Sequence, residues 1–298
     1  VRPGDRLASS PAYEVHTAGA EANVAVALAA LGRHVAWHSL LPDNTLGRRV
    51  ERDLAALGVD TSTVGWVPDG RLGTYFVELS EPPRPIRVLY DRQDSAVAAM
   101  TEADVPWDLV DTVPAVVVSG ITPALSPTCR GAVETLADRV RRGPGLWMVD
   151  VNHRAQLWSA DEARACLDRV AAGADLVVCT REDGRDVFGL DRPAADVAAG
   201  LADRLGAARV VVTDGDAGAH WTDGTDTGHV PAVPATIIDR LGAGDAFTAG
   251  VVDGVLDGDL ELGVRQGVAM GALALGMRGD QLRTTRDEVD ALLAGAGR

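Results

Sequence analysis

Two kinds of apolar segment alternate along most of this chain. Short apolar runs, such as the β-branched residues 115–119, are typical of strands buried in a parallel sheet. Longer segments rich in alanine and leucine lie between them and are typical of helices. Because parallel strands require a crossover connection, this alternation predicts an α/β fold. We expect a mostly parallel sheet with helices on both faces.

The remaining elements follow from the same pattern. The expected strands cover residues 35–41, 115–119, 146–151, 176–179 and 209–213. The expected helices cover residues 23–31, 46–57, 128–142, 161–172 and 194–205, and residues 243–293 are mostly helical. We find no repeat and no flexible linker, so we expect a single domain over residues 1–298.

One pair of segments interrupts the alternation. Residues 72–79 and 86–90 are strand-like and polar on one side, and the proline-rich residues 80–85 separate them. This pattern predicts a β-hairpin that projects from the sheet. The hairpin is either an edge decoration or a lid that closes over substrate, and we assign the lid to about residues 6–17 and 63–95. Its exposed strand edges could pair with a second copy, which would give a homodimer.

The sequence contains no lysine, so arginine is its only strongly basic residue. This excludes P-loop NTPases and protein kinases, which place a lysine on phosphates. It also excludes Schiff-base and pyridoxal-phosphate enzymes, which need a lysine amine. The net charge of −15 makes nucleic acid and anionic membranes poor partners. An anionic ligand would have to be attracted by local arginines and backbone dipoles.

Cysteine and histidine usage bears on compartment and on metals. The three cysteines are widely spaced and lie mostly in apolar segments, so we expect reduced thiols and a cytoplasmic protein. No apolar run approaches the length of a membrane span, and no secretory leader opens the sequence. The histidines show no metal-ligand spacing.

The strongest chemical signal is residues 239–247 (DRLGAGDAF), which precede an amphipathic helical stretch. Glycines allow a tight turn in which backbone N–H groups converge on an anion at a helix N-terminus. Asp245 lies in that first turn, where it could take a proton from a hydroxyl that attacks a phosphate. The same pattern also fits an ordinary capped helix. A dinucleotide fingerprint fits less well, because Phe247 stands where glycine or alanine is needed.

Two motifs carry a family resemblance. Residues 239–250 (DRLGAGDAFTAG) resemble the C-terminal signature of the PfkB/ribokinase family of carbohydrate kinases. Residues 19–25 (GAEANVA), followed by Leu31 and Gly32, resemble that family's N-terminal substrate motif. The resemblance implies a ribokinase-like fold with a small β lid. It also implies a kinase that uses ATP and Mg²⁺, with a monovalent cation as a further option.

The resemblance also implies roles for individual residues. Asp245 would be the catalytic base, and Gly242, Ala243 and Gly244 would form the anion hole for the γ-phosphate. Residues 213–218 (TDGDAG) resemble the loop beside the nucleotide. The implied nucleotide-binding residues are Thr180, Thr213, Gly215 and Gly218. The family usually carries Asn-x-x-Glu where this chain has residues 180–183 (TRED), so Asp183 is only a weak metal candidate.

Two arginines suggest the class of sugar. If the extended backbone of residues 146–151 continues, Asp150, Asn152 and Arg154 lie on one side and His153 points away to pack elsewhere. Arg92 shares a face with Tyr90 by the same spacing. Arginine is the preferred forked partner of a carboxylate, so two arginines at a sugar pocket suggest an acidic sugar. Each arginine alone could equally form a surface ion pair.

Further segments narrow the resemblance to the 2-keto-3-deoxygluconate kinase subgroup. They are residues 90–92 (YDR), 95–96 (SA), 119–122 (SGIT) and 150–158 (DVNHRAQLW). The substrate-binding residues implied by the motif matches are Gly19, Asn23, Tyr75, Tyr90, Arg92 and Arg154. We therefore expect ATP-dependent phosphorylation of a sugar-acid hydroxyl.

Two alternatives stay open. One is a kinase for a neutral sugar of the ribose or fructose type. The other is a catalytically silent sugar-binding homologue, suggested by the altered residues 180–183 and by the start of the chain. The sequence begins at Val1, after the family's first strand and its Gly-Glu, so one strand of the sheet and one wall of the sugar pocket are unaccounted for.

Overall fold

A six-stranded sheet forms the centre of the computed structural model, which describes residues 1, 5–80 and 84–295. Its strands are β5 (Ala115–Ser119), β6 (Leu146–Asp150), β7 (Leu176–Thr180), β8 (Val210–Thr213), β9 (Ala219–Thr222) and β10 (Thr227–Val230). They follow the order β10-β9-β8-β7-β6-β5. Strands β5 to β8 are parallel, and β9 and β10 are antiparallel to their neighbours. The predicted mostly parallel sheet is confirmed, although β9 and β10 were not foreseen.

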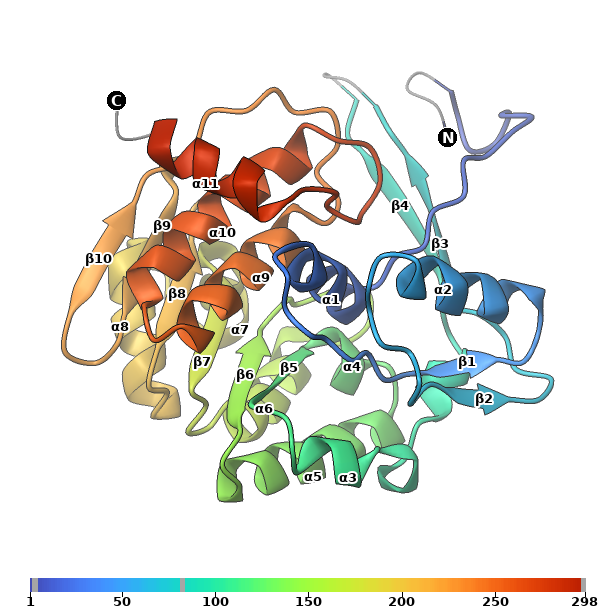
Figure 1. Ribbon diagram of the computed structural model, residues 1–298, viewed down its shortest axis with the longest axis horizontal. Coiled ribbons are helices and arrows are strands. Elements are labelled where there is room, and N and C mark those ends of the chain that lie inside the picture. Colours follow the sequence, from blue (N-terminus) through green and yellow to red (C-terminus); the bar gives the residue numbers. More distant parts are fainter. Residues whose placement is uncertain (2–4, 81–83, 296–298) are drawn as a thin grey trace.

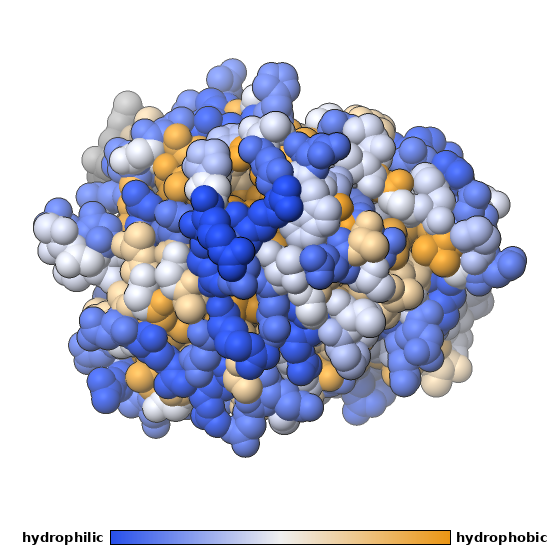
Figure 2. Space-filling view, turned by 90° about the horizontal axis from the view of Figure 1, so that it is seen from below, coloured by the Kyte–Doolittle hydropathy of each residue, from blue (hydrophilic) through white to orange (hydrophobic). Residues whose placement is uncertain are grey.

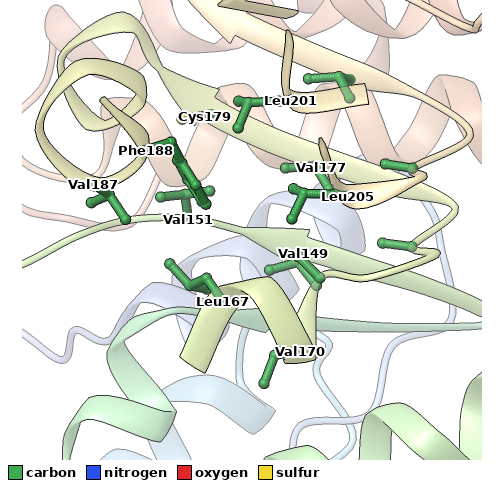
Figure 3. Packing of buried hydrophobic residues seen from close by; sticks show 14 of the residues in the cluster. Val149, Val151, Leu167, Val170, Val177, Cys179, Val187, Phe188, Leu201 and Leu205 are labelled. Atoms are coloured by element: carbon green, nitrogen blue, oxygen red, sulfur yellow. The ribbon is translucent and has the colours of Figure 1, made fainter. Parts of the chain in front are cut away.

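Helices cover both faces of this sheet, as predicted (Figure 1). One face carries α5 (Pro127–Arg142), α6 (Ala160–Val170), α7 (Arg181–Phe188) and α8 (Ala194–Leu205). The other carries α1 (Ala20–Ala30), α9 (Ala243–Leu256), α10 (Leu260–Leu275) and α11 (Arg286–Gly295). Successive residues of a strand point to opposite faces, so Val210 and Val212 enter one core and Val211 the other. Figure 3 shows the first core, in which Val149 and Val177 of the sheet pack with helical residues such as Leu167 and Leu201.

The segment before β5 forms smaller elements. They are β1 (Leu40–Pro42), α2 (Thr45–Ala55), β2 (Gly65–Val67), the short helix α3 (Trp107–Val110) and the 3₁₀ turns Ala96–Ala99 and Glu102–Asp104. The short helix α4 (Ile121–Ala124) follows β5. A third 3₁₀ turn, Gly215–Ala217, lies between β8 and β9. The expected strand at residues 35–41 is wrong in extent, because only β1 is a strand and it pairs with β2, outside the central sheet. The preceding residues bond to the loop at Asp60, through a single parallel bridge at Ala36, and so do not form a regular ladder.

The predicted hairpin is present as β3 (Thr74–Glu78) and β4 (Arg87–Asp91), a separate antiparallel pair (Figure 1). Its register places Tyr75 opposite Tyr90, with their ring centroids 5.9 Å apart. Val1 and Leu7 lie beside it: the amino group of Val1 donates a 2.7 Å hydrogen bond to the carbonyl of Val77, and the backbone N–H of Leu7 donates one to Glu78. Residues 81–83 of the expected connecting loop lie outside the described part of the chain.

Helices α9 and α10 pack backbone against backbone through four glycines. A Cβ on Gly250 would lie 2.4 Å from the backbone nitrogen of Gly267, and a Cβ on Gly254 would lie 2.2 Å from Cα of Gly263. No side chain larger than hydrogen fits between the two helices at these points. This contact fixes α9, and with it the turn at the N-terminus of α9.

None of the helices in the described ranges is long and apolar enough to cross a membrane. The face of the molecule shown in Figure 2 is mostly hydrophilic, with apolar residues in small separate groups. Such scattered apolar residues are normal on the surface of a folded domain.

Candidate active site

A cavity of about 1300 Å³ lies between the hairpin, the N-terminus of α1, the carboxyl ends of the parallel strands and the start of α9. Most of the residues expected at the site line it: Gly19, Asn23, Tyr75, Tyr90, Arg92, Arg154, Thr180, Asp183, Thr213, Gly242, Gly244 and Asp245. Its apolar end continues along β5, where Val116 and Val118 contribute to the wall. Ligands of open α/β sheets bind at the carboxyl ends of the strands, and this cavity has the size for a sugar and a nucleotide together.

The turn before α9 has the geometry of an anion site. Gly242 is the N-cap residue and has a φ of 73°, and a Cβ there would lie 1.8 Å from the carbonyl oxygen of Asp280. Glycine is therefore required at this position. A Cβ on Gly244 would meet no other atom within 4 Å, so the space beside this residue is open. The first N–H groups of a helix have no partner within the helix, and together with the helix dipole they attract an anion.

The carboxylate of Asp245 lies in the first turn of α9 and is 9% exposed, at the wall of the cavity. Its Oδ2 accepts a 2.7 Å hydrogen bond from Nδ2 of Asn23, and its Oδ1 lies 3.5 Å from Nδ2 of Asn152. Burial raises the pKa of Asp245 to about 6, against the opposing effects of Asn23 and of the positive charge of Arg154. The group is therefore ionised at neutral pH, with a basicity suited to proton transfer.

Two guanidinium groups face the cavity without carboxylate partners. The Cζ atom of Arg92 lies 3.9 Å from the ring centroid of Tyr90, and its Nε is buried without a hydrogen-bond partner. Arg154 donates a hydrogen bond only to the carbonyl of His153, and neither arginine forms an ion pair with any described residue. Burial, together with the charge of Arg154, lowers the pKa of Arg92. Two such cations provide a site for a carboxylate.

The predicted one-sided arrangement of Asp150, Asn152 and Arg154 holds for a different reason than expected. Strand β6 ends at Asp150 and Asn152 has a left-handed φ of 38°, so the extended period of two does not continue. All three residues nevertheless line the cavity, because the backbone turns at Asn152. His153 does not line it, and its Nε2 is buried without a partner, in keeping with the predicted packing role.

The expected nucleotide residues divide into two groups. Thr180 and Thr213 are register partners at the ends of β7 and β8, and both line the cavity. Gly215 and Gly218 belong to the turn after β8 and, like Ala243, are not among the lining residues. A Cβ on Gly218 would lie 2.1 Å from the carbonyl oxygen of Val230, so this glycine allows the turn to pack against β10.

Asp183, the metal candidate of the sequence analysis, lines the cavity. It lies in the first turn of α7, its Oδ2 accepts a 3.3 Å hydrogen bond from the backbone of His153, and burial raises its pKa. The residues that the structure describes contain no group of three histidine, cysteine or carboxylate side chains able to hold a metal ion. Mg²⁺ in phosphotransferases is held mainly by substrate phosphates and water, with one or two carboxylates. A site in which Asp183 is the one protein carboxylate near the metal would be consistent with that mode.

Comparison with known proteins agrees with this geometry. The pattern of the pfkB family carbohydrate kinases matches residues 3–286. The chain belongs to the pfkB family of carbohydrate kinases. A 2-dehydro-3-deoxygalactonokinase of Haloferax volcanii is 37% identical over 98% of this chain and 92% of its own length. A 2-dehydro-3-deoxygluconokinase of Bacillus subtilis is 32% identical over 88% of this chain and 82% of its own.

Solved structures of pfkB kinases resemble the fold closely. The 2-dehydro-3-deoxygluconokinase of Thermotoga maritima superimposes with a TM-score of 0.92 and 27% identity, covering 98% of this chain and 94% of its own. The ribokinase-like α/β fold expected from the sequence is confirmed.

Sequence reasoning missed two polar residues of this pfkB kinase site. Oε1 of Glu21 accepts hydrogen bonds from the backbone and hydroxyl of Ser119 (3.0 and 2.8 Å) and from the hydroxyl of Thr122 (2.6 Å), and so joins α1 to the end of β5. Asp280 contacts the hydroxyl of Tyr75 and joins the hairpin to the loop before α11. Burial raises the pKa of Asp280. Glu21 stands inside the recognised N-terminal motif, whereas nothing around Asp280 in the sequence marks it.

Proposed function

We propose that this kinase transfers the γ-phosphoryl group of ATP to a hydroxyl of a 2-keto-3-deoxy sugar acid. The supporting observation is that one cavity holds a buried carboxylate at a helix N-terminus, Asp245, together with Arg92 and Arg154. The carboxylate provides a base, and the arginines provide the site for an acidic group. The names of the Haloferax and Bacillus relatives, both kinases of 2-dehydro-3-deoxy sugar acids, support the same substrate class.

The substrate binds with its carboxylate at the two arginines. Gly19, Tyr75 and Tyr90 line the cavity around the carbon chain. The reacting hydroxyl lies beside Asp245, which takes its proton as the oxygen forms a bond to the γ-phosphorus. The bond from that phosphorus to the bridging oxygen breaks, and ADP leaves. The N–H groups of residues 242–245 stabilise the negative charge on the transferred phosphoryl group.

The nucleotide occupies the part of the cavity at the ends of β7 and β8. Thr180 and Thr213 line this part, and Gly215 and Gly218 shape the adjoining turn. Mg²⁺ would neutralise phosphate charge, and Asp183 is the carboxylate that would help to hold it. A monovalent cation near the anion hole is a further option. Residues 6–17 and 63–95 act as the lid, whose closure excludes water and so limits wasteful ATP hydrolysis.

The state of the cysteines bears on the compartment of the protein. All three cysteines are buried and free, as is usual in a reducing compartment, and we place the protein in the cytoplasm.

The hairpin bears on the oligomeric state. It has exposed apolar side chains, with Leu89 60% exposed, and two copies pairing through their hairpins would cover them. Replacing Leu89 with aspartate should then give a monomer in light scattering.

A coupled ADP-release assay tests the function. The panel contains 2-keto-3-deoxygluconate, its galactonate epimer, aldonic acids, ribose and fructose, each with ATP and Mg²⁺. We expect turnover with the keto-deoxy acids. Turnover with the neutral sugars alone would favour the neutral-sugar kinase, and binding of a sugar without ADP release would favour the silent homologue.

A further inference from the structure

A second amide, that of Asn152, approaches the carboxylate oxygen of Asp245 that Asn23 does not contact. Nδ2 of Asn152 lies 3.5 Å from Oδ1 of Asp245 and 3.4 Å from Oδ2 of Asp150. A side-chain amide carries two hydrogens, so Asn152 can donate one to each of these carboxyl groups. The distance to Asp245 is long, as such contacts often are before a substrate is bound. With Asn23 on the other oxygen, both oxygens of the base have an amide donor.

The backbone of Asn152 is held in an uncommon conformation. Three non-glycine residues in the described ranges have a positive φ, and two of them, Asp69 and Asp94, are exposed. Asn152 is 9% exposed, and its φ of 38° turns the chain back directly after β6. Asparagine tolerates this region better than most residues, but buried cases occur where the surroundings impose them and are frequent at functional sites.

Asp150 and Thr248 hold Asn152 in this backbone conformation. The hydroxyl of Thr248 donates a 3.2 Å hydrogen bond to the same Oδ2 of Asp150 that faces Asn152. Thr248 follows Asp245 by three residues on α9, so the two side chains lie on one face of the helix. Asp150 is therefore tied both to the helix that carries the base and to the amide that contacts the base.

The charge around Asp150 favours its neutral form. Desolvation, together with the negative charges of Asp245 on α9 and Asp183 on α7, raises the pKa of Asp150 to about 8, and Thr248 and Arg154 oppose this effect. A neutral acid at this position accepts hydrogen bonds from Thr248 and Asn152 without placing a second negative charge beside the base.

We propose that Asn152 is a positioning residue for the Asp245 base, and that Asp150 and Thr248 hold Asn152 in place. The proposal rests on the proposed function, because it assigns Asn152 a task in the proton transfer to Asp245. Asn152 fixes the orientation of the carboxylate and, as an N–H donor, favours its ionised form.

Asn152→Gly is the most informative variant. Glycine adopts a positive φ without strain, so the backbone turn is kept while the amide is lost. We expect the melting temperature to stay within a few degrees, kcat to fall about tenfold, and KM for the sugar to change little. The acidic limb of the kcat profile should move to higher pH, because Asp245 loses a donor while Asn23, Arg154, Glu21 and Asp280 still surround it. Asn152→Asp, which adds a negative charge, should move the limb further.

A matched pair of variants at Thr248 tests whether Thr248 and Asp150 hold Asn152 in place. Thr248→Ser keeps the hydroxyl and Thr248→Val removes it at nearly constant volume. Valine should lower kcat and move the acidic limb in the same direction as Asn152→Gly, and serine should restore most of both. Equal losses in the two variants, or a fall in kcat and melting temperature with no movement of the limb, would overturn the proposal.

A separate readout distinguishes this proposal from the proposed function. If the wild-type protein phosphorylates no sugar acid, the proposed function fails, but the protonation of Asp245 can still be followed through stability. Asp245→Asn should raise the melting temperature at high pH, in both the wild-type and the Asn152→Gly backgrounds. The gain should be larger, and should level off at a higher pH, in the Asn152→Gly background, because only the folded pKa of Asp245 rises there. The same size and the same levelling-off pH in both backgrounds would show that Asn152 does not act on Asp245.

Discussion

The side-chain amide of Asn23 donates a 2.7 Å hydrogen bond to Oδ2 of Asp245, although 222 positions separate the two residues in the sequence. This bond joins the first turn of α1 to the first turn of α9. The N-terminal and C-terminal motifs are therefore two halves of one site. The bond also opposes the effect of burial on the pKa of Asp245 and so keeps the base ionised near neutral pH.

Asp245→Asn should remove the base while keeping the shape of the site. We expect kcat to fall by about 10²–10⁴, the usual scale for the loss of a general base, with sugar and ATP still bound. Asp257→Asn, on the exposed C-terminal end of the same helix, is the control and should retain normal turnover. Calorimetry and ADP release measure the two quantities. Unchanged turnover in Asp245→Asn would refute the assignment of the base.

Activity should fall at acid pH because Asp245 must be ionised to accept a proton. Its pKa of about 6 lies above the ordinary value, so the carboxylate is lost as pH drops through about 6. We expect log kcat/KM to decline with unit slope below that point, measured at saturating ATP. A profile that stays flat down to pH 4.5 would show that another group accepts the proton.

Asp245→Asn should also stabilise the fold. A carboxyl group whose pKa is higher in the folded than in the unfolded protein lowers the stability of the fold at any pH where both states are ionised. This loss of stability shrinks as the pH falls below the folded pKa, and it is gone once the pH is below the unfolded pKa. Asp245→Asn should therefore raise stability at pH 8 by ~2–3 kcal/mol, from about two pKa units at 1.36 kcal/mol each. The gain should vanish near pH 4. Thermal melts across this range measure it, and a gain independent of pH would contradict the argument.

Much of the fold could be predicted because its elements carry local signals. The strands β5 to β8 are short apolar runs, β-branched in β5, β7 and β8, and the glycines after α1 and α2 mark the ends of those helices. Strands β9 and β10 were missed because Ala219–Thr222 and Thr227–Val230 contain histidines, glycine and threonines and lack a clear apolar period. The short β1 was overextended because hydrogen-bond partners outside the segment determine where it begins.

The residues of the site also fall into those that the sequence identified and those that it did not. Asp245, Gly242 and Asn23 stand in motifs whose spacing carries the chemistry, so the sequence pointed to them. Asp280 acts through a contact with Tyr75 that only the folded chain creates, and 205 positions separate the two. The left-handed turn at Asn152 could not be foreseen either, because the packing around Asp150 imposes it on a residue that follows an ordinary strand.

Arg92 and Arg154 should determine the preference for acidic substrates. Replacing Arg154 with alanine should raise KM for a keto-deoxy acid about 10- to 100-fold, since a hydrogen-bonded charged group contributes ~1.5–3 kcal/mol. KM for a neutral sugar should change far less. Arg139→Ala is the control, because Arg139 is half-exposed and paired with Asp111 at 2.5 Å. Equal increases of KM for acidic and neutral sugars would indicate a structural arginine.

The two glycines of the anion turn should respond differently to alanine. Gly242→Ala places a Cβ against the backbone of Asp280 at a positive φ, so we expect a lower melting temperature and the loss of most activity. Gly244→Ala has open space and a helical position, so the fold should be unchanged or slightly more stable, by ~0.5–1 kcal/mol. Its methyl group would instead meet the phosphate and raise KM for ATP about tenfold or more. Unaltered ATP kinetics in Gly244→Ala would place the phosphate elsewhere.

The contact between Gly250, Gly254, Gly263 and Gly267 has a consequence for how this protein can vary. None of these four positions lines the cavity, yet even one added methyl would push α9 away from α10 and tilt the helix that carries Asp245. Deep mutational scanning should therefore find a second intolerant region, remote from the chemistry and nearly as strict as the active site. In a library built to broaden substrate range, these codons are the ones to leave unrandomised.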